Sequence, residues 1–182
     1  MRSLIVGIVL STVLIGGCET ADRPAEEIVQ PSEEEIERYR PAGEEVAVAL
    51  MGSLKSELSA AIQQGGVVSA VEFCRTRALP VTDAVADSFD MAVSVKRTTF
   101  RYRNPQNAPD EAERQALEHF EEVLAREESL PTSYMQKIDR GGDEVYRYYH
   151  PMRVQGLCLT CHGARQDMTP ERREILDQRY PE

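Results

Sequence analysis

Cys158-Leu159-Thr160-Cys161-His162 is the stretch around which the chain is organised. Cys-x-x-Cys-His is the spacing at which a c-type haem is attached, because each cysteine sulfur can form a thioether with one vinyl group of the haem. The histidine that follows then lies beneath the ring, with a ring nitrogen directed at the iron. The pentapeptide therefore predicts two covalent anchors, Cys158 and Cys161, and one axial metal ligand, His162.

A redox-active Cys-x-x-Cys pair and half of a zinc site are the alternatives for this stretch. A thioredoxin-like pair is expected to open a helix after a strand of a βαβ pattern, and a tetrahedral zinc site needs a second Cys or His pair at similar spacing. The chain holds 4 Cys and 3 His, and its sequence contains no second pair of this kind. We therefore favour one covalently attached haem c, provided that the protein is exported to where haem is attached.

The first residues have the form of an export signal. Arg2 precedes an uncharged apolar run from Leu4 to Gly17. At about 14 residues, this run is shorter than the about 20 that a membrane-spanning helix requires. Its end resembles the cleavage site of a bacterial lipoprotein, in which Cys18 becomes the first mature residue and carries the lipid. An ordinary cleaved signal peptide over residues 1–17 is the alternative. Either interpretation places the mature protein outside the cytoplasm. The lipoprotein interpretation also places it on the periplasmic side of a bacterial membrane, anchored by its lipid.

Residues 18–43 are expected to form an acidic, flexible tether, because this stretch has too few apolar side chains to bury a core of its own. The sequence from Ser32 to Glu35 has the form of a capping box, so a short helical turn is expected there, ended by Pro41. The formal net charge of the chain is -10 at pH 7, which excludes a nucleic-acid partner and gives no reason to expect binding to anionic lipid. One domain, residues 44–182, follows the tether.

Apolar residues in this domain recur with helical periods in some stretches and with strand periods in others. Gly65-Gly66 is expected to end the first helix, and Thr169-Pro170 to cap and start the last one. A hairpin is expected between the last two strands. The expected elements are helices over 44–64, 67–79, 81–89, 110–128 and 170–179, and strands over 91–103, 133–139 and 144–150.

Three groups of residues, taken in order along the chain, resemble a known family. They are Glu72-Phe73-Cys74-Arg75, then Arg97-Thr98-Thr99 with the stretch from Arg103 to Asp110, then the stretch from Leu157 to Gly163. The family consists of periplasmic c-type haem proteins with a PAS-like domain, found alone as small cytochromes and as sensor regions of bacterial signalling proteins. The resemblance implies an α+β fold, with N-terminal helices leading into a PAS-like antiparallel sheet flanked by helices, and a haem between helix and sheet.

Cys74 is the cysteine left after Cys18 is assigned to lipid and Cys158 and Cys161 to haem. From its position alone, packing as a small buried apolar side chain is the simpler explanation. The resemblance implies another role, because the family is known for His and Cys coordination of the iron and Cys74 falls in its matching helical motif. It implies Cys74 and His162 as the two axial ligands, and we expect the thiolate to be favoured by ferric iron and by nearby Arg75 and Arg77.

A basic cluster stands out in this acidic chain, at Lys96, Arg97, Arg101 and Arg103. Arginine pairs well with carboxylates, so Arg97 or Arg103 is a candidate for binding the haem propionates. A solvated strand face explains the cluster equally well.

Two functions of different classes follow. The first is a redox or gas sensor acting through a His/Cys-ligated haem, which requires a separate redox or signalling partner because no kinase, cyclase or DNA-binding segment follows Tyr180. The alternative is a small monohaem cytochrome that acts as an electron carrier. An enzyme such as a peroxidase is not expected, because no distal acid-base histidine stands out in the sequence.

Overall fold

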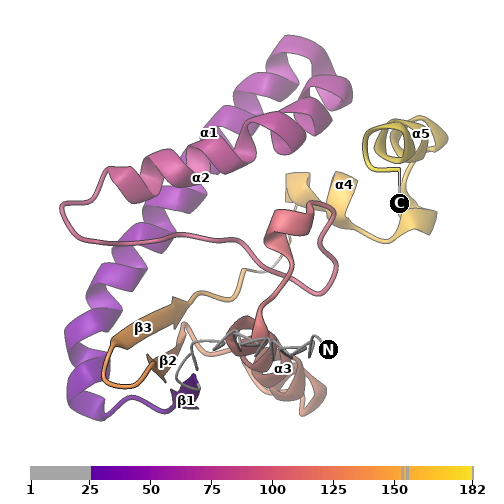
Figure 1. Cartoon of the computed structure of the whole chain (residues 1–182). Helices are drawn as coiled ribbons and strands as arrows, with labels where there is room; N and C mark the ends of the chain where they lie inside the picture. The colour runs from indigo at the N-terminus through magenta and orange to yellow at the C-terminus, as the bar shows by residue number, and fades with distance from the viewer. Residues whose placement is uncertain (1–25, 153, 155, 182) are drawn as a thin grey trace, which may run out of the picture.

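The computed structural model describes residues 26–152, 154 and 156–181 (Figure 1). The signal peptide expected over 1–17 and the lipidation expected at Cys18 lie outside these residues. The fold is α+β, as predicted, with a long N-terminal helix, a three-stranded antiparallel sheet and flanking helices. The elements are β1 (Glu27–Val29), α1 (Glu33–Thr76), α2 (Ala78–Asp87), η1 (Pro105–Asn107), α3 (Glu111–Ala125), β2 (Tyr134–Asp139), β3 (Glu144–Tyr149), η2 (Gly156–Cys158), α4 (Leu159–His162), η3 (Arg165–Asp167) and α5 (Pro170–Arg179).

The long helix α1 is two helices joined at Gly65 and Gly66, which have non-helical backbone angles. Gly66 has φ 62° and ψ -144°, a conformation that side-chain-bearing residues rarely adopt. The chain reverses there, so that residues 67–76, the second arm, and α2 run back alongside residues 33–64, the first arm (Figure 1). The predicted break at the two glycines is therefore confirmed.

The start of α1 carries the predicted capping box. The hydroxyl of Ser32 accepts from the backbone N–H of Glu35, and the carboxylate of Glu35 accepts from the backbone N–H of Ser32 at 2.7 Å. Two N–H groups that have no partner within the helix are thereby satisfied.

The helix does not end at Pro41, where the sequence analysis placed its end. A proline inside a helix costs about 3 kcal/mol, so packing on both sides must offset it. Before the proline, the ring of Tyr39 stacks on that of Tyr146 with centroids 4.2 Å apart; after it, Val46 is buried. Residues 27–43, which were expected to be flexible, accordingly form β1 and the first turns of α1.

The sheet has the order β1-β2-β3, with both pairs antiparallel. The predicted hairpin is confirmed, since Tyr134 of β2 pairs with Tyr149 of β3. β1 pairs along the other edge of β2, where Ile28 lies opposite Ile138, a side chain with no exposed surface. The first described strand thus completes a sheet whose other strands come from the second half of the chain.

The strand expected over residues 91–103 is wrong, because this stretch forms no ladder in the structure. Side-chain bonds hold it instead. The ammonium group of Lys96 donates to the carbonyl oxygen of Ala108 at 2.7 Å and to the carboxylate of Glu113 at 2.6 Å. We call residues 91–109 the crossing segment, since Figure 1 shows them running across the middle of the molecule from α2 toward α3.

The last helices begin where the sequence predicts. Asp110 and Glu113 form a second capping box at the start of α3. Thr169 caps α5, and Pro170 occupies its first turn. The helix α5 packs on the second arm of α1. The buried residues of this contact are Val71, Met168 and Leu176.

None of the helices within the described residues combines the length and the hydropathy that crossing a membrane requires.

Candidate functional site

The pentapeptide folds as a single turn. Cys158 closes η2 and precedes α4, which holds Cys161 and His162. Residues three and four positions apart lie on one face of a helix, so the two thiols and the imidazole share one side of the turn. Gly163 ends the turn, where its N–H donates to the carbonyl oxygen of Leu159 at 2.9 Å. Both thiols are free and half-buried.

Cys74 belongs to the same site, although it lies on the second arm of α1. Desolvation raises the pKa of its thiol, and the nearby sulfurs of Cys161 and Cys158 raise it further. The guanidinium groups of Arg97 and Arg103 act in the opposite direction. Because such effects fall off with distance, they place the three thiols and the two arginines in one region.

The thiols do not form a compact metal cluster. Within the described ranges, no three His, Cys, Asp or Glu side chains are arranged to hold a metal ion.

Arg97 offers a hydrogen-bond donor that no described residue uses. Its Nε is buried and has no partner. Desolvation lowers the pKa of Arg97, while the neighbouring Cys74 and Tyr180 partly restore it. A buried guanidinium N–H without an acceptor is costly, so the position fits a carboxylate supplied by a bound group.

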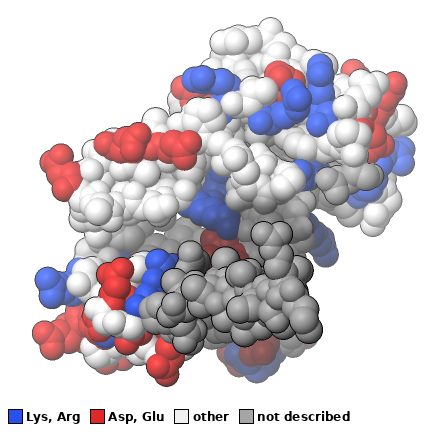
Figure 2. Space-filling model, viewed as in Figure 1, with Lys and Arg blue, Asp and Glu red and all other residues white. Residues whose placement is uncertain are grey.

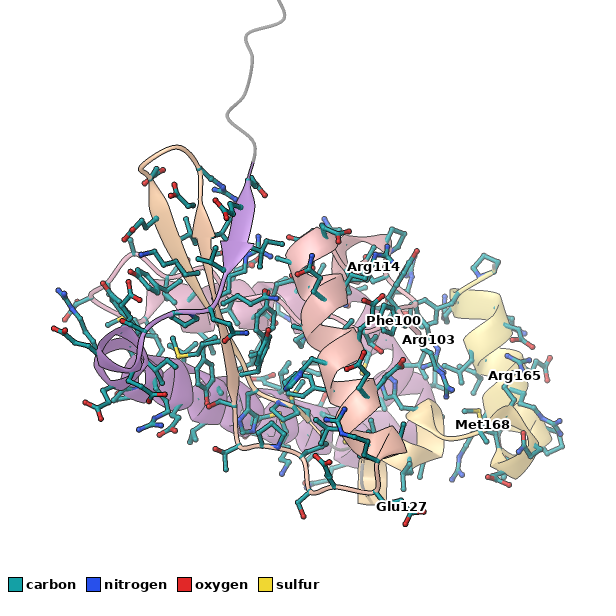
Figure 3. All side chains as sticks on the ribbon, turned by 90° about the horizontal axis from the view of Figure 1, so that it is seen from below. Phe100, Arg103, Arg114, Glu127, Arg165 and Met168 are labelled. Carbon is teal, nitrogen blue, oxygen red and sulfur yellow. The ribbon has the colours of Figure 1, made fainter. Side chains whose placement is uncertain are left out.

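Arg103 is engaged with the motif itself. Its Nη2 donates to the carbonyl oxygen of Cys161 at 2.7 Å. Its guanidinium carbon lies 6.0 Å from the centre of the Tyr180 ring. In Figure 3 the side chain of Arg103 lies between α3 and the C-terminal stretch that carries Met168.

The imidazole of His162 is held toward its neutral form. Desolvation is the main reason that its pKa is lowered, and the positive charges of Arg103 and Arg97 contribute. The neutral imidazole is the form that coordinates a metal. Figure 2 shows a hollow in the face of the molecule that it draws, with basic side chains near the middle of the hollow.

The structure thus gathers residues from α1, the crossing segment and the turn of α4. All six site residues that the sequence singled out within the described chain are among them: Cys74, Arg97, Arg103, Cys158, Cys161 and His162. Their roles stay predictions.

Sequence reasoning missed two residues that support the site. Tyr180 packs on the same small core as Cys161, and no local pattern marks it. Glu113 fixes Lys96, the neighbour of Arg97, and is buried. The Asp-x-x-Glu spacing of the capping box before α3 was the signal available for Glu113.

These residues fit a haem c. Two thiols and an imidazole share one turn, as covalent attachment with axial ligation requires. A third thiol lies in the same region, and Arg97 provides an unpaired donor for a propionate. Thiolate and imidazole are suitable ligands for haem iron.

Comparison with known proteins agrees with the extent of the fold. A family model described as Tll0287-like matches residues 21–182, a range that includes every described element. Neither the curated proteins nor the solved structures contain a match.

Proposed function

The chain belongs to the Tll0287-like family, and from that premise we propose that it is a periplasmic protein that holds one covalent haem c and acts in redox or gas sensing. The observation that carries the proposal is that the Cys74 thiol lies near Cys158 and Cys161 and near Arg97, whose Nε has no acceptor among the described residues. Separate parts of the chain supply these groups, so the fold itself assembles the site.

The proposed roles follow from chemistry and position. Cys158 and Cys161 form the thioethers, and His162 and Cys74 are the axial ligands. Arg97 donates to a haem propionate through its free N–H, in keeping with its burial. When bound, the haem supplies an iron that changes oxidation state and binds small gases.

A sensing role is preferred because the surroundings of Cys74, the proposed ligand, act on the protonation of its thiol in opposite directions. Burial favours its protonated thiol, whereas Arg97 and Arg103 favour the thiolate. A residue under such opposed influences responds to a change in charge nearby. Binding or release of Cys74 is therefore the response that we propose for oxidation, reduction or a bound gas.

One observation favours the alternative, an electron carrier. Leu159 within the motif is 48 % exposed and Tyr102 of the crossing segment is 46 % exposed. Apolar side chains exposed beside a haem edge suit the transient docking of a redox partner.

The proposal also covers location and partners. A lipid on Cys18 anchors the protein on the periplasmic side of a bacterial membrane, and a separate redox or signalling protein receives its output. We propose neither a catalytic activity nor a nucleic-acid partner.

Spectroscopy on protein matured with the haem-attachment machinery tests this function. The pigment is expected to survive denaturation and acid-organic extraction, and to be lost in the Cys158→Ala/Cys161→Ala variant. A sensor changes its ligands on reduction or on addition of CO, whereas a carrier keeps them. A wild-type protein without covalent pigment would overturn the proposal.

A further inference from the structure

The turn that holds Cys158, Cys161 and His162 is too short to be stable by itself. The helix α4 has four residues, and the N–H of Gly163 ends it by donating to the carbonyl oxygen of Leu159. An isolated helix of this length is not stable in water. Contacts from outside the turn must therefore hold its geometry.

Arg103 supplies such a contact at the end of the turn. The carbonyl oxygen of Cys161 is one of the last carbonyls of α4, which lack partners inside a helix. Arg103 Nη2 reaches it at 2.7 Å from the crossing segment. A cationic donor at a helix C-terminus is doubly suited, since it forms a charge-assisted hydrogen bond and complements the partial negative charge there.

The same guanidinium also reaches the end of the chain. It lies 6.0 Å from the centre of the Tyr180 ring, within the range of a cation–π contact. Tyr180 packs against the core of Val71, Met168 and Leu176, as Cys161 does. Arg103 thus connects the crossing segment, the turn and the residue that follows α5.

The base of this connection is fixed. The crossing segment has no strand partner among the described residues, but Lys96 holds it to Ala108 and to the buried carboxylate of Glu113. Thr98 adds a bond to the carbonyl oxygen of Asn107 at 3.3 Å. Arg103 therefore extends from a backbone that is fixed by the protein's own hydrogen bonds.

We propose that Arg103 is a positioning residue that clamps the Cys-x-x-Cys-His turn in the orientation needed for haem attachment, a role that rests on the proposed function. Its acceptor, the Cys161 carbonyl oxygen, belongs to the protein itself. This separates it from Arg97, whose Nε has no acceptor among the described residues and is left for the bound group.

Hydrogen exchange measured by mass spectrometry on the full chain tests the clamp, with samples prepared both with and without the haem-attachment machinery. In Arg103→Gln, the amides of residues 156–163 are expected to exchange about tenfold faster in both samples, and less haem is attached. Arg103→Lys keeps the charge but not the planar fork, so an intermediate effect is expected. Arg101→Gln is the matched control, since Arg101 is exposed in the same segment; its exchange should equal that of the wild type.

Two outcomes would overturn the clamp. One is wild-type exchange in the haem-free Arg103→Gln and Arg103→Lys proteins. The other is faster exchange only in the haem-loaded samples, which would assign Arg103 to the propionates. Because the haem-free sample gives its own result, a wild-type protein that never acquires haem refutes the proposed function without deciding the clamp. If Arg103→Gln does not fold, Arg103→Lys gives the result.

Discussion

Glu35 is the residue through which the start of α1 is bonded to the sheet. Its carboxylate accepts from the phenol of Tyr146 at 2.5 Å and pairs with the ammonium group of Lys137 at 2.9 Å, in addition to capping at Ser32. These bonds, that from Tyr146 first, lower the pKa of Glu35 from 4.5 to about 2. The carboxylate is therefore charged at neutral pH.

This shift predicts how stability depends on pH. A carboxyl group with a lowered folded-state pKa stabilises fully above its unfolded value of 4.5, and the contribution is lost as the pH falls toward about 2. The melting temperature of wild type should exceed that of Glu35→Gln above pH 4.5, and the difference should shrink between pH 4.5 and 2. Circular dichroism melts measure it. Glu37→Gln, at an exposed position, is the control; equal behaviour of both variants would show that the network has no such effect.

Cys74 provides a second prediction for a single residue. Replacement by Ala should leave covalent haem in place, because the thioethers are on Cys158 and Cys161, but should change the oxidised spectrum and raise the reduction potential. Potentiometry with optical spectra measures both. An unchanged low-spin spectrum and potential would mean that a residue other than Cys74 binds the iron.

Individual residues were predictable where the signal is local. The spacing of Cys158, Cys161 and His162 is contained in five positions, so sequence alone identifies it. Arg97 and Arg103 look alike in sequence. They differ because Arg103 donates to the carbonyl oxygen of Cys161, which is 58 residues away along the chain. Only the folded chain contains that information.

Gly66 determines the shape of the longest element. Its φ of 62° with ψ -144° lies where a Cβ is strained, even though open space surrounds it. Gly66→Ala should lower the free energy of unfolding by about 1–3 kcal/mol. Gly52→Ala is the matched control: this glycine is inside the first arm with nothing within 4 Å of an added Cβ, so a gain of about 0.5–1 kcal/mol is expected. Urea unfolding measures both, and equal effects would show that the reversal does not require glycine.

Secondary-structure elements were predictable where their ends carry capping signals. The helix α3 begins at a capping box, and the helix α5 begins at Thr169-Pro170. Each signal lies within a few residues of the helix end that it marks. The crossing segment alternates like a strand, but a strand also needs a partner, and Lys96 bonds to Glu113 instead. Pro41 failed as a stop signal because packing against the sheet outweighs it.

At the scale of the whole molecule, the site and the sheet lie against different parts of α1. The first arm contacts β3, whereas the second arm contacts α5 (Figure 1). The site is therefore built on the second arm, and the N-terminal strand belongs to the sheet.

Membrane attachment is tested on the whole protein. Lipidation at Cys18 predicts that wild type sediments with membranes and that Cys18→Ser is released, since no helix among the described residues can span a bilayer. Cys74→Ser should remain in the membrane fraction, as the matched control. Retention of Cys18→Ser after a high-salt wash would place the anchor elsewhere.

For a molecule anchored by a lipid on Cys18, the start of the fold at Glu27 limits how far the domain can lie from the bilayer. From Cys18, the backbone up to Glu27 reaches at most about 30 Å when fully extended, whereas a tether that ended at residue 44 would reach about 90 Å. The domain would thus be confined to a thin layer next to the bilayer. Under the proposed lipid anchor, the search for a partner would become nearly two-dimensional, which would raise the local concentration of partners in the same membrane.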